Sequence, residues 1–104
     1  MSDTKIVGID GKLWHSKADF YDALAEGLGS FDGHGRNADA FLETMIFNLD
    51  LNEVQPPYRV VIANAPDGLH GFLGQFARWI AEARTERLND PEWGDDVEVT
   101  MVIQ

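Results

Sequence analysis

Cysteine is absent from this chain of 104 residues, and basic side chains are few: eight lysines and arginines stand against 18 aspartates and glutamates, a formal charge of −10. Without cysteine the chain has no disulfide framework, no thiolate metal ligand and no cysteine nucleophile. Long apolar runs are missing as well, since the longest covers only residues 60–63, and we expect no membrane-spanning segment. A surface this acidic repels nucleic acid and anionic lipid, so we expect direct binding to neither.

The rest of the composition is typical of one globular domain. Hydrophobic residues make up 44% and charged residues 25% of the sequence, and two separate cores would each be near the size that needs extra stabilisation. We therefore expect a single domain over residues 1–104, a monomer when free. The N-terminal residues lack the apolar core of a signal peptide, which predicts a cytoplasmic protein. The acidity either serves solubility alone or steers a basic protein partner toward the surface.

Periodicity and turn residues predict the order strand, helix, helix, strand, helix, strand. The strands are expected at residues 5–9, 58–63 and 97–103. The nearly continuous apolar run at 58–63 is typical of a strand covered on both faces. The first helix begins after Ser16, which forms a capping-box pattern with Asp19, and the third covers residues 72–88 after a loop at 64–71. With right-handed crossovers, this order predicts an α/β fold, a small three-stranded parallel sheet packed by helices.

The second helix is predicted to have two different faces. It starts at Asn37, a favourable N-cap residue, and ends by Asp50, because two prolines follow. On a helical wheel of 100° per residue, the apolar face holds Ala38, Phe41, Leu42, Met45 and Leu49. The other face holds Asp39, Glu43 and Asp50, with Ile46 next to them and Phe47 beyond. The helix thus combines a buried stripe with an acidic one.

Residue patterns that carry catalysis or bind cofactors are missing. The three histidines, His15, His34 and His70, show no metal-ligand spacing, so we expect neither a metal nor a cofactor. The glycine loop at 33–35 lacks the lysine and hydroxyl residues of a phosphate loop. Asp39 and Glu43 share a helix face and could form an acid–base pair in a small hydrolase, but paired catalytic acids normally come from opposite walls of a cleft. We therefore expect a protein that is not an enzyme.

The segment that leads into the second helix resembles that of a known family. It reads His34-Gly35-Arg36-Asn37-Ala38-Asp39-Ala40-Phe41, and it follows Ile9-Asp10-Gly11 and Ser16-x-x-Asp19-Phe20. The pattern is similar to that of the barstar family of intracellular ribonuclease inhibitors, whose hallmark is aromatic-Gly-x-Asn-x-Asp-Ala-hydrophobic at this place. The resemblance covers nearly the whole chain in element order and is strongest over these eight residues.

This resemblance implies an inhibitor that plugs the active site of a basic microbial ribonuclease with its acidic helix and the loop before it. The matching positions are His34, Gly35, Asn37, Ala38, Asp39, Leu42, Glu43, Ile46 and Phe47, with Glu82 of the third helix. Physical chemistry supports the role, because carboxylates on one helix stripe can occupy phosphate positions and pair bidentately with arginine. Phe47 beside that stripe suits the centre of an interface.

Three positions depart from the family pattern and leave the partner open. Glu43 stands where aspartate is common, Leu42 at a tryptophan position, and Gly33 at an aromatic position. A second interpretation is therefore an immunity protein for a related nuclease toxin, or a regulatory module of the same fold that binds another basic partner. The hydrolase is a third interpretation, and it requires a concave pocket around Asp39 and Glu43.

Overall fold

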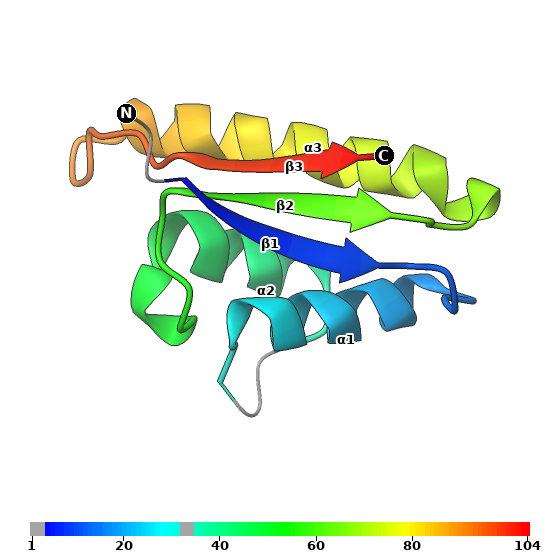
Figure 1. The fold of residues 1–104 in the computed structure, drawn as a ribbon. Coiled ribbons are helices and arrows are strands. Elements are labelled where there is room, and N and C mark those ends of the chain that lie inside the picture. Colours follow the sequence, from blue (N-terminus) through cyan, green and yellow to red (C-terminus); the bar gives the residue numbers. More distant parts are fainter. Residues whose placement is uncertain (1–3, 32–34) are drawn as a thin grey trace.

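Three parallel strands and three helices follow one another in the order strand, helix, helix, strand, helix, strand that the sequence predicts, which confirms the α/β fold (Figure 1). The computed structural model describes residues 4–31 and 35–104. Its elements are β1 (Lys5–Asp10), α1 (Lys17–Leu28), α2 (Ala38–Leu42), the π-helical turn η1 (Glu43–Phe47), the 3₁₀ helix η2 (Leu49–Leu51), β2 (Tyr58–Ala63), α3 (Asp67–Leu88) and β3 (Val99–Ile103). None of the helices in this part of the chain is both long enough and apolar enough to cross a bilayer.

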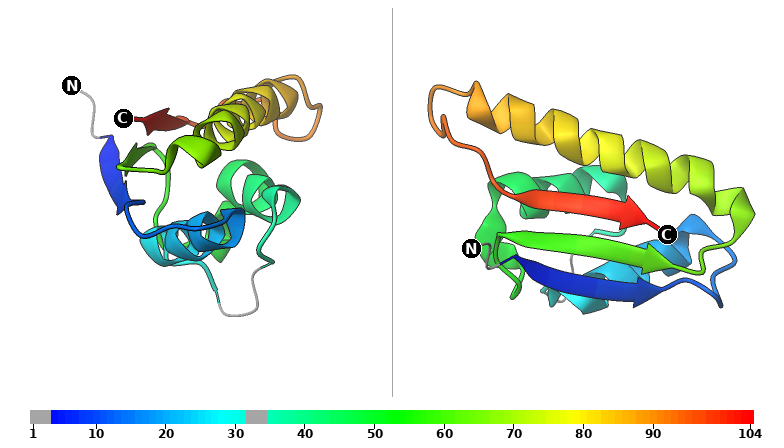
Figure 2. Two further views of the ribbon diagram at one scale, coloured as in Figure 1. Left: turned by 90° about the vertical axis from the view of Figure 1, so that its right-hand side faces the viewer. Right: turned by 45° about the horizontal axis from the view of Figure 1, so that its top comes forward.

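All the helices cover the same face of the sheet. The strands lie in the order β1-β2-β3, and two right-handed crossovers that step in one direction place their helices on one side. The left view of Figure 2 shows this arrangement, with the other face of the sheet uncovered. The prediction that residues 58–63 are covered on both faces is therefore wrong: Arg59 is exposed, and on the neighbouring strands Ile6 is 62% and Val102 42% exposed.

The ends of α1 follow from local sequence signals. The Asp19 carboxylate accepts hydrogen bonds from the backbone N–H groups of His15 and Ser16, at 2.6 and 3.1 Å, which confirms the role predicted for this side chain at the N-terminus. These bonds, the one from His15 first, lower the pKa of Asp19. Gly29 ends the helix in the left-handed conformation, with φ of 64°, where a side chain would be strained.

Asp19→Asn is expected to reduce the dependence of stability on pH. The folded state lowers the pKa of Asp19 below its ordinary value of 3.8. The ionised Asp19 carboxylate therefore stabilises the folded state fully above that value, and this contribution is lost as the pH falls through the lowered pKa. Thermal unfolding between about pH 2 and pH 6 measures the effect. Glu26→Gln removes the same charge from an exposed position of the same helix and is the control. An equal change of slope in both variants would contradict the prediction.

Two element boundaries differ from the sequence prediction. Helix α3 begins at Asp67 rather than at residue 72, directly after Pro66, so the predicted loop at 64–71 is wrong over most of its length. Gly68 and Gly71 suggested a loop, but both lie in the first turns of the helix, where they are exposed. Strand β3 begins at Val99 instead of residue 97.

A cluster of aromatic rings joins the three helices. Phe20 of α1 packs edge-on against Phe76 of α3, with ring centroids 5.2 Å apart. Tyr21 of α1 stacks on Phe41 of α2 at 5.6 Å and also contacts Phe72 of α3. Phe20, Phe41 and Phe76 are fully buried. The buried side of the short helix α2 therefore packs against α1 and α3, which holds the exposed residues of α2 in a defined position.

Candidate partner-binding surface

The N-terminus of α2 is built by two residues of the predicted motif. The side-chain oxygen of Asn37 accepts a hydrogen bond from the backbone N–H of Ala40 at 2.8 Å, which confirms Asn37 as the N-cap. Gly35 lies close to this cap, because a Cβ at that position would come within 3.1 Å of the Ala40 Cβ and 3.3 Å of the Asn37 amide nitrogen. Glycine thus lets the chain pass tightly over the first turn. His34 and Gly33 lie outside the described residues.

Asp39 is exposed in the first turn of α2, where the helix N-terminus favours a negative charge. Burial, and to a smaller extent the charge of the Asp39 carboxylate, raise the pKa of Tyr21. Among the described residues no arginine forms an ion pair with Asp39, since Arg36 pairs with Asp22 at 3.1 Å. The charge of Asp39 therefore faces solvent without an internal counter-ion in this part of the chain.

The second helix changes its geometry at Glu43. The backbone N–H of Asn48 donates to the carbonyl of Glu43 at 2.7 Å, a bond that spans five residues and defines the π-helical turn η1. The side-chain amide of Asn48 also donates to the exposed Glu43 carboxylate. One regular helix from Asn37 to Asp50, as predicted, is therefore wrong: α2 ends at Leu42, and Asp50 lies in the separate helix η2.

Ile46 is placed differently from its prediction. The widened turn shifts later residues around the axis relative to a wheel of 100° per residue, and Ile46 turns into the core with 0% exposure. Thr44 and Met45 are buried beside it, so three consecutive residues of η1 face inward. The position of Ile46 next to the acidic residues is thus a wrong prediction, and its side chain is not on the surface.

Phe47 belongs to a contact between η1 and the end of α3. Its ring lies 5.1 Å from that of Trp93, in the segment between α3 and β3. Arg87 of α3 donates from Nη1 to the carbonyl of Ile46 at 2.6 Å and pairs through Nε with Asp95 at 3.1 Å. The guanidinium also lies 5.7 Å from the centroid of the Trp93 ring. Sequence reasoning missed Arg87 and Trp93, although a lone tryptophan within the acidic run 90–98 was a visible signal.

The remaining predicted residues are spread over α2, η1 and α3, which contact one another. Glu82 is exposed on α3, whereas Ala38, Leu42 and Phe47 are half-buried and pack against the core. The structure therefore brings most of the predicted positions onto neighbouring helices, while Ile46 lies beneath them. In the described residues that surface offers exposed carboxylates on Asp39, Glu43 and Glu82.

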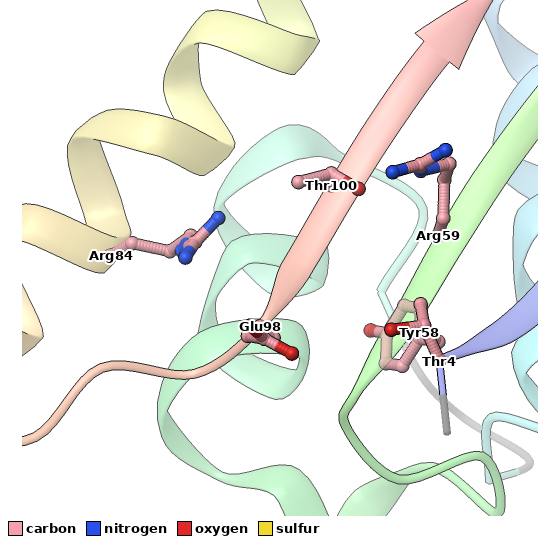
Figure 3. Close-up of a pocket in the computed structure, with 6 residues that line it drawn as sticks. All are labelled: Thr4, Tyr58, Arg59, Arg84, Glu98 and Thr100. Atoms are coloured by element: carbon pink, nitrogen blue, oxygen red, sulfur yellow. The ribbon is translucent and has the colours of Figure 1, made fainter. Parts of the chain in front are cut away.

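The surface pockets of the described residues include one beside η1 that is lined by the predicted site residue Phe47, together with Asn48. One cavity of about 220 Å³, shown in Figure 3, is lined by Thr4, Tyr58, Arg59, Arg84, Glu98 and Thr100. Neither Asp39 nor Glu43 lines this cavity or the three others found beside η1, η2 and β1. The described residues also contain no group of three histidine, aspartate or glutamate side chains that could hold a metal ion. The concave acid–base site that the hydrolase interpretation requires is thus not among these cavities.

A family model described as "Barstar (barnase inhibitor)" matches residues 4–103, nearly the whole chain. The chain belongs to the barstar family. The match includes the segment 34–41 and confirms the resemblance that those residues carry. Members of the barstar family are inhibitors rather than enzymes, which agrees with the expectation of a non-catalytic protein. A search of curated proteins found no match.

Proposed function

We propose that this barstar-family protein is a cytoplasmic inhibitor of a basic, barnase-type ribonuclease, and that it covers the ribonuclease active site with α2, η1 and the loop before α2. The observation that supports this most is the exposure of Asp39 and Glu43 on a rigid support, with no arginine of the described residues paired to either. A ribonuclease binds phosphates with basic side chains. Two outward carboxylates on neighbouring turns can take the place of those phosphates.

The contact residues that we propose are His34, Gly35, Asn37, Ala38, Asp39, Leu42, Glu43, Phe47 and Glu82. Ile46 is removed from direct contact because its side chain is buried. Asn37 and Asn48 act as positioning residues, since they hold the first turn of α2 and the Glu43 carboxylate. Because the first turn of α2 and the Glu43 carboxylate are already held in place in the free protein, less conformational entropy is lost when the partner binds.

The net charge supports rapid association with a basic partner. At −10 on 104 residues, the protein attracts a positively charged enzyme over distances up to about a Debye length, which grows as the ionic strength falls. Such steering is weakened by salt, whereas buried apolar contacts are not. The salt response therefore separates an electrostatic interface from an apolar one.

Titration of purified barnase with this protein, with RNA cleavage as the readout, tests the proposal. We expect complete inhibition at one equivalent in about 50 mM salt, and inhibition weaker by about tenfold or more in about 500 mM salt, because the carboxylate–arginine contacts are screened. A heat-unfolded sample is the control for non-specific effects. Unchanged RNA cleavage at high protein excess would contradict inhibition of barnase.

A second candidate is an immunity or regulatory role toward a different basic protein. It is favoured by Glu43, whose carboxylate reaches one methylene further than an aspartate and is tied to Asn48. It is also favoured by Leu42, which is half-buried and presents no large aromatic surface. In the same titration this role would appear as salt-sensitive binding, measured by calorimetry, with no loss of RNA cleavage.

A further inference from the structure

The segment between α3 and β3, residues 89–98, is an acidic loop with an exposed tryptophan at its centre. It contains five acidic residues and no lysine or arginine. The acidic residues are Asp90, Glu92, Asp95, Asp96 and Glu98. Trp93 is 41% exposed. An exposed tryptophan surrounded by carboxylates is unusual for a surface that serves only solubility, because tryptophan is enriched at the centres of binding interfaces.

Two arginines of α3 hold this acidic loop in place. Arg84 donates to both carboxylate oxygens of Asp96, at 2.9 and 2.7 Å, and these bonds lower the pKa of Asp96. One turn further, Arg87 donates to Asp95 at 3.1 Å. The loop is thus fastened to the helix at two successive residues. Trp93 is only two positions away and is presented from a fixed backbone.

The acidic loop continues the surface formed by η1. The rings of Trp93 and Phe47 lie 5.1 Å apart at an angle of 58°, so the loop and the π-helical turn share an aromatic contact. One face of the Trp93 ring lies near the Arg87 guanidinium, whose charge Asp95 compensates. Glu92 is exposed next to Trp93, and its backbone N–H donates to Asp90. The Trp93 ring therefore contacts Phe47 and lies near the Arg87 guanidinium, and exposed Glu92 precedes it in the chain.

We propose that Trp93 and the neighbouring Glu92 receive a lysine or arginine side chain of the basic ribonuclease partner, which makes the acidic loop a second contact region. A cation over an indole ring gains from the electron-rich face, and a nearby carboxylate strengthens the attraction. This inference rests on the proposed function, because it requires a basic partner bound over η1. It adds a specificity determinant that lies outside α2, η1 and the loop before α2.

The test compares barnase inhibition by Trp93→Leu, Trp93→Phe and the unchanged protein. For a cation over the ring, we expect Trp93→Leu to raise the inhibition constant about tenfold and Trp93→Phe to raise it less, about threefold. Leu13→Ala is the control: Leu13 is 77% exposed in the turn between β1 and α1, at the opposite end of the sheet from the acidic loop (Figure 1). We expect no change in that variant.

A second measurement addresses the cation itself. Lysines and arginines of barnase are replaced singly by alanine, and each variant is titrated with the unchanged protein and with Trp93→Leu. One replacement is expected to weaken binding to the unchanged protein about tenfold and to have little effect on binding to Trp93→Leu. Additive effects at every position would overturn the inference, as would equal losses in Trp93→Leu and Trp93→Phe, which indicate an apolar contact.

Failure of this inference and failure of the proposed function give different results. If Trp93→Leu inhibits like the unchanged protein while Asp39→Ala loses inhibition, the role of Trp93 is refuted and the inhibitor function stands. If the unchanged protein does not inhibit barnase, the proposed function fails and the inference fails with it. Urea unfolding of each Trp93 variant is measured first, and a midpoint equal to that of the unchanged protein ensures that lost inhibition reports on the contact.

Discussion

Asp39→Ala is expected to weaken inhibition of barnase by about 30-fold or more, measured as the inhibition constant for RNA cleavage. The Asp39 carboxylate has no arginine partner among the described residues, so it is available to the basic side chains of the enzyme. Its removal leaves those side chains desolvated and unpaired in the complex, which costs more than the loss of a surface charge. The fold should persist, because Asp39 is exposed and the N-cap bond of Asn37 is retained.

The matched control for this prediction is Asp50→Ala. Asp50, like Asp39, is an exposed aspartate, and its replacement removes the same charge. It lies in η2, beyond the π-helical turn, so it is not part of the surface formed by α2 and η1. We expect a small change, explained by weaker long-range attraction. A loss of inhibition as large as that of Asp39→Ala would show that total charge, rather than the placement of Asp39, determines binding.

Local signals explain why much of the fold could be predicted from the sequence. The capping residues Asp19 and Asn37 act on backbone groups within a few positions, and strand β2 was predicted with the bounds Tyr58–Ala63 that the structure shows. The open face of the sheet could not be predicted, because it depends on the order of the strands. Since β1-β2-β3 are neighbours in chain order, both crossovers lie on one side, and no local pattern determines that order.

In the candidate site, too, local patterns predicted some positions and not others. Asn37 and Asp39 were correctly placed because the first turn of α2 has regular α-helical geometry. Ile46 and Asp50 were not, because a wheel of 100° per residue does not describe a turn closed by a bond between Asn48 and Glu43, although Met45 is buried as predicted. The contact of Arg87 with the carbonyl of Ile46 joins residues 41 positions apart. Pairings of this kind depend on tertiary packing, and single-sequence periodicity carries no information about them.

Arg87 connects three parts of the molecule that the sequence separates. Its guanidinium donates to the Ile46 and Phe47 carbonyls at the end of η1, at 2.6 and 3.4 Å, and to Asp95 in the acidic loop. The residue is only 8% exposed, and its bond to the Ile46 carbonyl is buried, whereas its partner Asp95 is 61% exposed. Its position in the last turn of α3 is also favourable for the helix dipole. Arg87 therefore helps to hold the end of η1, and with it Phe47, against α3 and the acidic loop.

Arg87→Met is expected to lower the free energy of unfolding by roughly 2–3 kcal/mol, because the Ile46 carbonyl is left buried without its donor while methionine retains the packing of the stem. Urea unfolding measures this loss as a lower midpoint. Arg84→Met, one turn earlier, is the control: Arg84 pairs with Asp96, which is 44% exposed, and its longer bond of 3.3 Å to the Val99 carbonyl is only partly buried, so we expect a smaller loss of about 1 kcal/mol or less. Equal losses of stability in the two variants would contradict the idea that the buried bond from Arg87 to the Ile46 carbonyl contributes most of the effect. A larger loss for Arg87→Met, together with weaker inhibition of barnase at a temperature where the variant is still folded, would show that this arginine positions the surface formed by η1.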